Sequence, residues 1–315
     1  MKKLCLLLLL PICCWSQRQN LLLEATFDGS NPFAGFTLAN GQYCCSYSIN
    51  QVTNPQGPGQ VIKYDLRSTD AIVSSSLRAE IQLQGNDAPE SSERWYGLQY
   101  YLQNYGTDPG PESIMQWHDV DGSCPPLSLQ VQGGRLRITQ CIDGGNTHND
   151  LGPVVSNTWF SIVAHIKWTT GNTGIIQVWR DGQRLVNKSN IRTNSTGGSY
   201  FKLGINKWSW APPLVGSSNQ TQRIFYIDNF RMGNQNASYN DVAPFPLVVT
   251  PVIWGYFRYN DNIKTLEWAT ETEQNNDHFE VQESDDGANW TTIASVASKA
   301  IDGNSNSTIT YSYQL

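Results

Sequence analysis

The chain has 315 residues, of which 15% are charged and 11% aromatic, and it contains 11 Trp, 14 Tyr and 26 Gly. This composition is typical of a β-rich globular protein and excludes a disordered chain or a coiled coil. The formal net charge of −6 excludes a nucleic-acid binder, which would carry a basic stripe, but it allows a polyanionic sugar held by a few well-placed cations.

The first 16 residues have the pattern of a secretory signal peptide. Two lysines precede an apolar run at 4–10, and a short region at 14–16 suits cleavage. The apolar run is too short for a membrane span. We therefore expect a secreted protein without a membrane span. Lipid attachment at Cys13 is the weaker alternative, because Pro11 and Ile12 are poor neighbours for such a site.

Four cysteines follow this segment, an even number that suits disulfides in an oxidising compartment. A hairpin at 126–141, turning at two consecutive glycines, would bring Cys124 close to Cys141, and we favour that bridge. Cys44 and Cys45 have no obvious partners. A metal site is the weaker alternative for them, because no second CxxC or histidine cluster accompanies them.

Between residues 20 and 233 we find no amphipathic helix, but many short alternating runs separated by Gly, Asn, Asp and Pro. Ten or more strands at this spacing predict a two-sheet sandwich or jelly roll. His148 lies in a Gly- and Asn-rich run that we expect to be a loop. The clearest strands are residues 21–27, 76–83, 95–102, 113–118, 127–132, 136–141, 159–168, 174–180, 200–205 and 223–232.

Three of these strands carry one apolar face and one face of specific polar groups. Successive side chains of a strand point to opposite faces, so Met115 and Trp117 would enter a core. If the three strands share a sheet, their polar faces form a cationic, hydrogen-bonding floor that suits a sugar acid. A histidine on a strand is otherwise often a plain surface residue. The polar faces hold Ile114, Gln116 and His118; Arg78, Glu80 and Gln82; and Lys202, Gly204, Asn206 and Trp208.

The composition changes after residue 233. Residues 234–250 are polar and then proline-bearing, which predicts a linker. A second series of strands occupies 251–315, with too few strands to complete a sandwich comfortably. The sequence stops directly after an expected strand, so we expect this second module to be incomplete.

Seven blocks of sequence in the region 20–233 carry a family resemblance. They are RAE at 78–80, ERWYG at 93–97, IMQWH at 114–118, PPL at 125–127, GIIQVWRDG at 174–182, YFKLGI at 200–205 and YID at 226–228. In this order they resemble the polysaccharide lyase family that includes heparin lyase I-type and glucuronan lyase enzymes. The resemblance implies an all-β, concanavalin A-like β-jelly roll that acts on an acidic polysaccharide.

The tail resembles a different module. LEWAT at 266–270, EQNN at 273–276, FEV at 279–281, SDDG at 284–287 and Trp290 are similar to fibronectin III-like modules near the C-termini of secreted Bacteroidetes proteins. The resemblance implies a partial Ig or fibronectin III-like β-sandwich at 251–315.

A polysaccharide lyase removes the C5 proton beside a uronate carboxylate and expels the 4-linked sugar by β-elimination. The site must neutralise the carboxylate, accept the proton and protonate the leaving oxygen. The resemblance assigns His118 as base or proton shuttle and Gln116 as a hydrogen-bond partner of the substrate. It gives Arg78 and Lys202 as the positive charges, with Glu80 orienting Arg78. Alternatively, Arg78 and Glu80 form a merely structural ion pair.

The sequence departs from the family at Asn206. Heparin lyase I-type enzymes have a catalytic tyrosine there, in a Lys-x-Gly-x-Tyr pattern, and an asparagine cannot exchange a proton at neutral pH. Three alternatives follow: Tyr96, Tyr100 or Tyr101 serves as the acid, His118 makes both transfers, or the site only binds. The set we expect to bind substrate is Glu80, Arg94, Asn206, Lys207 and Trp208.

These residues favour a secreted lyase for a uronate-containing polysaccharide. The alternative is a non-catalytic carbohydrate-binding protein on the same fold. A glycoside hydrolase of the laminarinase type needs two closely spaced carboxylates on one strand, and no Glu-x-Asp-x-x-Glu run occurs.

We expect no cofactor to be required, and we consider a structural calcium ion as one of two interpretations of three carboxylates. In jelly rolls of this class the first and last strands often share one, and Glu24, Asp28 and Asp228 are placed to offer oxygen ligands. The alternative is that Asp28 belongs to a turn and Asp228 is an ordinary strand-edge residue.

Overall fold

The computed structural model describes residues 20–83, 88–119, 124–214, 217–244, 252–273, 276–286, 289–301, 303, 305 and 307–315. Contacts divide the described chain into two compact units, one up to residue 244 and one from residue 252. The predicted signal peptide lies outside the described residues, as does the end of the predicted linker. Within the described ranges, no helix has the length and apolar character needed to cross a membrane.

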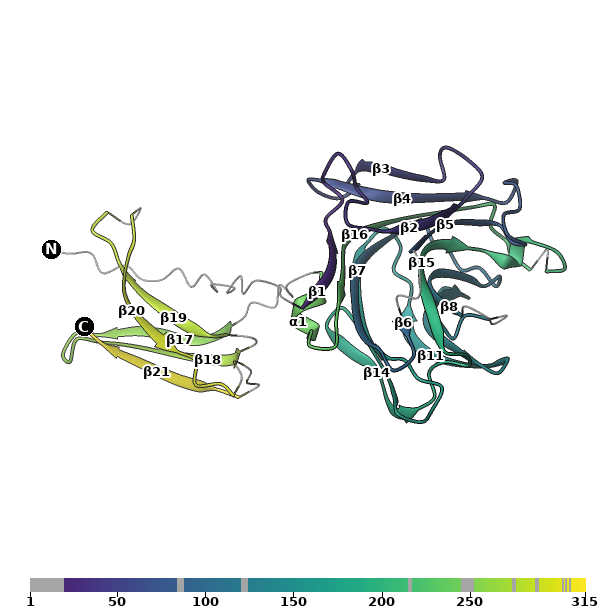
Figure 1. Cartoon of the computed structure of the whole chain (residues 1–315). Helices are drawn as coiled ribbons and strands as arrows, with labels where there is room; N and C mark the ends of the chain where they lie inside the picture. The colour runs from purple at the N-terminus through teal and green to yellow at the C-terminus, as the bar shows by residue number, and fades with distance from the viewer. Residues whose placement is uncertain are drawn as a thin grey trace. The chain divides into compact units, whose positions relative to one another are not determined.

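The larger unit is a sandwich of two antiparallel sheets (Figure 1), which confirms the predicted all-β jelly roll. Sheet A has the order β14-β13-β12-β7-β16-β4-β3, with β1 beside β16. Its strands are β1 (Leu21–Ala25), β3 (Ile49–Thr53), β4 (Gln60–Arg67), β7 (Glu93–Gln103), β12 (Trp159–Lys167), β13 (Gly174–Arg180), β14 (Gln183–Ile191) and β16 (Gln222–Gly233).

Sheet B has the order β11-β10-β9-β8-β15-β5-β2, with β6 beside β15. Its strands are β2 (Leu38–Gln42), β5 (Arg78–Leu83), β6 (Ala88–Pro89), β8 (Glu112–Asp119), β9 (Leu127–Gln132), β10 (Arg135–Ile142), β11 (Gly145–Pro153) and β15 (Gly198–Asn206). In the described part of this unit, two short helices follow strands, η1 (Trp208–Trp210) after β15 and α1 (Tyr239–Val242) after β16.

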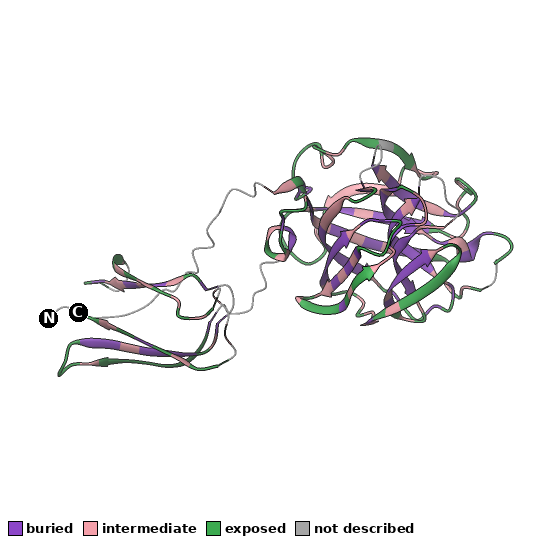
Figure 2. Ribbon diagram, turned by 60° about the horizontal axis from the view of Figure 1, so that its bottom comes forward, coloured by how far each residue is buried: buried purple, intermediate pink, exposed green. Residues whose placement is uncertain are grey.

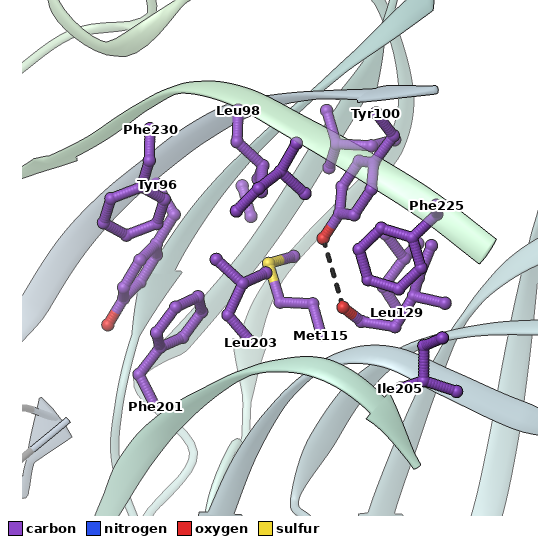
Figure 3. Close-up of a cluster of buried hydrophobic side chains, with 14 of the residues drawn as sticks. Tyr96, Leu98, Tyr100, Met115, Leu129, Phe201, Leu203, Ile205, Phe225 and Phe230 are labelled. Atoms are coloured by element: carbon purple, nitrogen blue, oxygen red, sulfur yellow. Dashed lines mark hydrogen bonds between the residues drawn. The ribbon is translucent and has the colours of Figure 1, made fainter. Parts of the chain in front are cut away.

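The core of this unit lies between the two sheets and is rich in aromatic rings (Figure 3). Tyr96 of sheet A stacks on Phe201 of sheet B, with ring centroids 5.3 Å apart. Figure 2 shows buried residues along the strands and exposed residues at edge hairpins and loops. Burying each large apolar side chain contributes about 1.5–3 kcal/mol to folding, so this layer holds sheet B in place.

Two irregularities interrupt the alternation in sheet B. The register of β8 against β9 shifts between Ser113 and Met115, and Ile114, predicted on the polar face, lies in the core cluster instead. In β15 the register shifts between Leu203 and Asn206. Gly204 occupies this bulge with φ +137°, and a Cβ there would lie 2.1 Å from the Ala79 carbonyl oxygen. Only glycine fits this close approach of two backbones.

The smaller unit contains, within the described residues, a three-stranded sheet β17-β18-β21 and a two-stranded sheet β19-β20. Its core includes Trp268, Phe279 and Tyr311. The fibronectin III-like assignment stays a prediction. The strands are β17 (Val252–Asn260), β18 (Thr265–Glu273), β19 (His278–Glu283), β20 (Thr291–Ala297) and β21 (Ile309–Gln314).

Two disulfides lie in the described part of the larger unit. One joins Cys124 to Cys141, the pair predicted from the expected hairpin at 126–141. The other joins the neighbours Cys44 and Cys45, for which the sequence indicated no partner. With Asp70, these two form a group of potential metal ligands, but both sulfur atoms are already bonded to each other.

Candidate active site

The polar faces of β8, β15 and β5 meet because these strands are neighbours in sheet B. Tyr200 lies opposite His118, and Lys202 lies opposite Gln116. On the other side of β15, Asn206 lies opposite Arg78. Directly opposite residues of an antiparallel pair share a face, so the three strands form one polar surface.

The centre of this surface is the buried carboxylate of Glu80, which is 0% exposed. It accepts hydrogen bonds from Lys202 Nζ at 2.8 Å, Gln116 Nε2 at 2.5 Å and Arg78 Nη1 at 3.4 Å. Burial of a charge is tolerated when it is paired and hydrogen-bonded in this way. Glu80 contributes one negative charge, and Lys202 and Arg78 contribute two positive charges. The excess positive charge suits an anionic ligand.

Arg78 is fixed by more than this ion pair. Its Nη1 donates to Gln42 Oε1 at 3.0 Å, and its Nη2 donates to the Ser74 carbonyl at 2.9 Å. The 3.4 Å distance between Arg78 Nη1 and Glu80 Oε2 is consistent with both interpretations of the sequence. Glu80 either orients Arg78 or forms a structural ion pair with it. The guanidinium therefore presents a fixed charge at the polar surface.

The half-buried His118 has the tautomer that a base requires. Its Nδ1 lies 2.9 Å from the Asp119 carbonyl oxygen. A carbonyl can only accept, so Nδ1 carries the proton and Nε2 keeps a free lone pair. Burial, aided by the positive charges of Lys202 and Arg78, lowers the pKa of His118 from its usual 6.5. The imidazole is therefore neutral at pH 7.

Tyr200 is the residue that the sequence reasoning missed. Its ring stacks on His118, with centroids 5.3 Å apart and planes inclined by 19°. Burial, with the negative charge of Glu80, raises the pKa of Tyr200 from 10.0. Its phenol is therefore protonated at neutral pH. The alternation of β15 was signal enough, because Tyr200 precedes Lys202 by two residues and shares its face.

None of the three tyrosines proposed from the sequence reaches this surface. Tyr96 and Tyr100 lie in the core between the sheets (Figure 3), where the Tyr100 hydroxyl donates to the Ile114 carbonyl at 3.4 Å. Tyr101 lies on sheet A, where it packs against Trp159 and Tyr226.

Exposure separates the predicted site residues into two layers. Lys202 and Gln116 are each only 1% exposed, so in this arrangement they lie beneath the surface with Glu80. His118, Tyr200 and Asn206 are half-buried and accessible from solvent. Asn206 Oδ1 accepts a hydrogen bond from Ser76 Oγ at 2.7 Å, which leaves its amide NH2 group as the donor.

Lys207 does not lie with these residues, which corrects its predicted role in substrate binding. It is fully buried, and its Nζ lies 2.9 Å from Asp108 and 2.8 Å from Glu112. Arg223 contacts the same two carboxylates. Lys207 therefore belongs to a buried ion network that anchors the end of β15.

The structure also corrects the predicted role of Arg94 in substrate binding. It belongs to β7 in sheet A, so the structure does not group it with the residues of sheet B. It lines an open cavity of about 490 Å³ together with Glu93, Lys167 and Gln235. Trp208, the remaining predicted contact, is half-buried at the start of η1, two residues after Asn206.

The predicted calcium ligands are only partly available. Glu24 is engaged by Arg231 at 2.9 Å. Asp28 accepts a hydrogen bond from the Gln60 amide at 2.8 Å and retains a second carboxylate oxygen. Burial, with the negative charge of Asp28, raises the pKa of Asp228 to about 6. Two neighbouring carboxylates fit a hard cation, whose other ligands would be carbonyl oxygens or water.

Comparison with the solved structure of a glucuronan lyase supports the fold. An endo-β-1,4-glucuronan lyase from the fungus Trichoderma reesei is 19% identical, with a TM-score of 0.56 over 71% of this chain and 98% of that chain. The alginate lyase AlgAT5, from polysaccharide lyase family 7, is 18% identical, with a TM-score of 0.46 over 61% of this chain and 85% of that chain. At such identities the likeness shows the fold alone.

Sequence comparison supplies the family. No curated protein sequence matches the chain. The model of the family described as polysaccharide lyase matches residues 25–231, which is more than half of the chain and includes β5, β8 and β15. The chain therefore belongs to the polysaccharide lyase family.

Proposed function

We propose that the protein is a lyase that cleaves a uronic-acid-containing polysaccharide by β-elimination on the polar surface of sheet B. The observation that supports this most is the layered arrangement around Glu80. A neutral histidine and a protonated tyrosine lie on the same polar surface as Glu80, Lys202 and Arg78, which together carry an excess positive charge. Such a surface offers a base, an acid and an electrostatic partner for a carboxylate.

In the proposed reaction, His118 Nε2 takes the C5 proton of the uronate. The electron pair of that C–H bond forms the C4=C5 double bond, and the C4–O bond breaks. The departing oxygen takes a proton from the Tyr200 hydroxyl. Arg78 would neutralise the substrate carboxylate and the NH2 group of Asn206 would donate a hydrogen bond to it, which makes the C5 proton more acidic.

Lys202 and Gln116 act in this proposal as positioning residues and not as substrate contacts. Both bind Glu80 and are almost fully buried. Together they hold the Glu80 carboxylate in place beneath Arg78 and His118. The charge of Lys202 would act on the substrate electrostatically, and Gln116 would act only by positioning Glu80.

Glucuronan is the first polymer to test, because the glucuronan lyase structure has the same fold over nearly its whole length. The purified protein would be incubated with glucuronan, alginate and heparin while the ultraviolet absorbance of the unsaturated uronate is followed. Appearance of this product supports the proposal. A lack of product from every polyuronate contradicts it.

A non-catalytic carbohydrate-binding protein is the second candidate. Asn206 at the family's tyrosine position and the burial of Lys202 favour it. Binding of the same polymers without any unsaturated product would support this alternative.

Export to the cell surface or medium is part of the proposal. The two disulfides in the described part of the chain suit an oxidising compartment. Mass spectrometry of the protein isolated from its natural source would find a mature N-terminus near residue 17. An intact N-terminus on a cytoplasmic protein would contradict export.

A further inference from the structure

Arg137 on β10 is a cation on the same face of sheet B as the proposed site. Its Nε and Nη2 both donate to Gln130 Oε1, at 3.2 and 3.0 Å. Among the described residues it forms no ion pair, because Asp150, its register partner on β11, is bound by Nε and Nη2 of Arg135. Three of the five guanidinium N–H groups of Arg137 therefore remain available.

Three polar side chains near Arg137, those of Gln130, Thr139 and His148, are uncharged at neutral pH. Thr139 Oγ1 donates to Gln130 Oε1 at 2.9 Å and lies 2.9 Å from His148 Nδ1. Burial and the charge of Arg137 lower the pKa of His148, and burial lowers the pKa of Arg137 itself. We call Gln130, Arg137, Thr139 and His148 the β10 patch.

The strand register places the β10 patch relative to the proposed site. Arg137 pairs with Gln130, Gln130 with Ser113, Ser113 with Asn206, and Asn206 with Arg78. The two arginines thus lie in one row, four strand spacings apart, which is roughly 19 Å along the sheet. One sugar cannot contact both, but an extended chain laid across the strands can.

We propose that the β10 patch is a second carboxylate-binding subsite, which takes a uronate unit several sugars away from the one at His118. This inference rests on the proposed function for the class of polymer. A guanidinium binds a carboxylate with paired, charge-assisted hydrogen bonds. A half-buried cation without an anion is poorly compensated, so such a ligand would supply what the protein leaves out. Thr139 and His148 would contact the hydroxyl groups of the same sugar.

The test compares ligands of two lengths by calorimetry, in a His118→Asn background that prevents turnover. The probes are the disaccharide and hexasaccharide of glucuronate, and the same pair of mannuronate. Arg137→Gln removes the charge but keeps a hydrogen-bonding side chain. We expect it to weaken hexasaccharide binding at least tenfold and to leave disaccharide binding unchanged.

Arg184→Gln is the matched control, because Arg184 is an exposed arginine on β14 of sheet A. This variant removes one positive charge, as Arg137→Gln does, and should change the affinity for neither the disaccharide nor the hexasaccharide. Arg137→Lys, which keeps the charge but loses the planar fork, should weaken hexasaccharide binding less than Arg137→Gln. If Arg137→Gln fails to fold, the affinities of Arg137→Lys for the hexasaccharide and the disaccharide decide whether the subsite exists.

Equal weakening for both lengths, no weakening, or no binding of either hexasaccharide by the parent protein overturns the subsite. The outcome is separable from the proposed function. Selective loss of hexasaccharide binding in a protein that makes no unsaturated product overturns the lyase reaction and keeps the subsite. Product formation without selective loss of hexasaccharide binding supports the lyase reaction and overturns the subsite.

Discussion

The ring of Tyr200 stacks on the imidazole of His118, with centroids 5.3 Å apart, as direct cross-strand neighbours of β15 and β8. Burial shifts the pKa values of the two groups in opposite directions. It lowers the pKa of His118, which keeps the base neutral, and raises the pKa of Tyr200, which keeps the acid protonated. Pairs of titratable groups whose pKa values are driven apart are what acid–base chemistry at neutral pH needs.

We predict that Tyr200→Phe lowers kcat on the responsive polyuronate by about 10²–10⁴-fold, the usual contribution of a positioned acid. The ring stacking on His118 is retained in this variant, so substrate affinity should change little. Initial rates of ultraviolet absorbance across a range of polymer concentrations separate kcat from KM.

Two further variants sharpen this test. Tyr101→Phe removes a hydroxyl from sheet A and should leave kcat unchanged. Asn206→Tyr restores a tyrosine at the family's position, and added to Tyr200→Phe it should recover part of the lost rate. Full activity in Tyr200→Phe would eliminate Tyr200 as the acid and leave both proton transfers to His118.

The pH dependence of kcat/KM should show the titration of His118. Because its pKa is lowered from 6.5, the neutral base is depleted only at more acidic pH. We therefore expect kcat/KM to rise with pH through a midpoint below 6.5 and then to level off. Since the pKa of Tyr200 is raised from 10.0, the alkaline fall should come above pH 10.

His118→Asn should lower kcat/KM by about 10²–10⁴-fold and remove the acidic limb of this profile. His278→Asn is the matched control, because His278 lies in the smaller unit and pairs with Asp277. An unchanged acidic limb in His118→Asn would assign that titration to another group.

The sequence could predict the polar surface because alternation survives along most of each strand. Gln116, His118 and Lys202 share a face for this reason, and the family blocks placed their strands in one domain. Alternation failed where the backbone departs from a regular strand. Ile114 follows a register shift, and Lys207 lies just beyond the end of β15, where it turns into a buried ion network.

Other features had no local signal. The motif around Arg94 identifies a family block but not the sheet to which the strand belongs. The Gly- and Asn-rich run around His148 was predicted to be a loop, yet it forms β11 by pairing with β10. His148 was therefore expected in a loop, although it lies on the polar face beside Thr139. Pairing with a neighbour, not the sequence of the strand, determines such edge strands.

Glu80→Gln should lower the free energy of unfolding of the larger unit by about 3–5 kcal/mol, because it leaves Lys202 and Arg78 without their shared buried carboxylate. Urea unfolding followed by tryptophan fluorescence measures the change. Asp143→Asn, which breaks the exposed pair with Arg192, should cost at most about 1 kcal/mol. Adding Lys202→Met to Glu80→Gln should restore part of the stability. A loss no larger than that of Asp143→Asn would show that Glu80 is not the electrostatic centre.

Calcium should stabilise the larger unit through Asp28 and Asp228. Without a cation, burial and, in addition, repulsion by the charge of Asp28 raise the pKa of Asp228 to about 6. A divalent cation bound to both groups would relieve that repulsion. Free calcium at 100 times its Kd would add about 2.7 kcal/mol, which raises the thermal midpoint relative to protein in EDTA.

Asp228→Asn separates this effect from general ionic strength. It removes the poorly solvated charge, so it should raise the thermal midpoint in EDTA at pH 7 and abolish the response to calcium. Glu24→Gln should keep the response, because Glu24 is engaged by Arg231. Magnesium should stabilise less, since it demands a stricter octahedral geometry than the carboxylates of Asp28, just after β1, and Asp228, on β16, provide. Equal midpoints in calcium and EDTA for the parent protein would mean that Asp28 and Asp228 form no cation site.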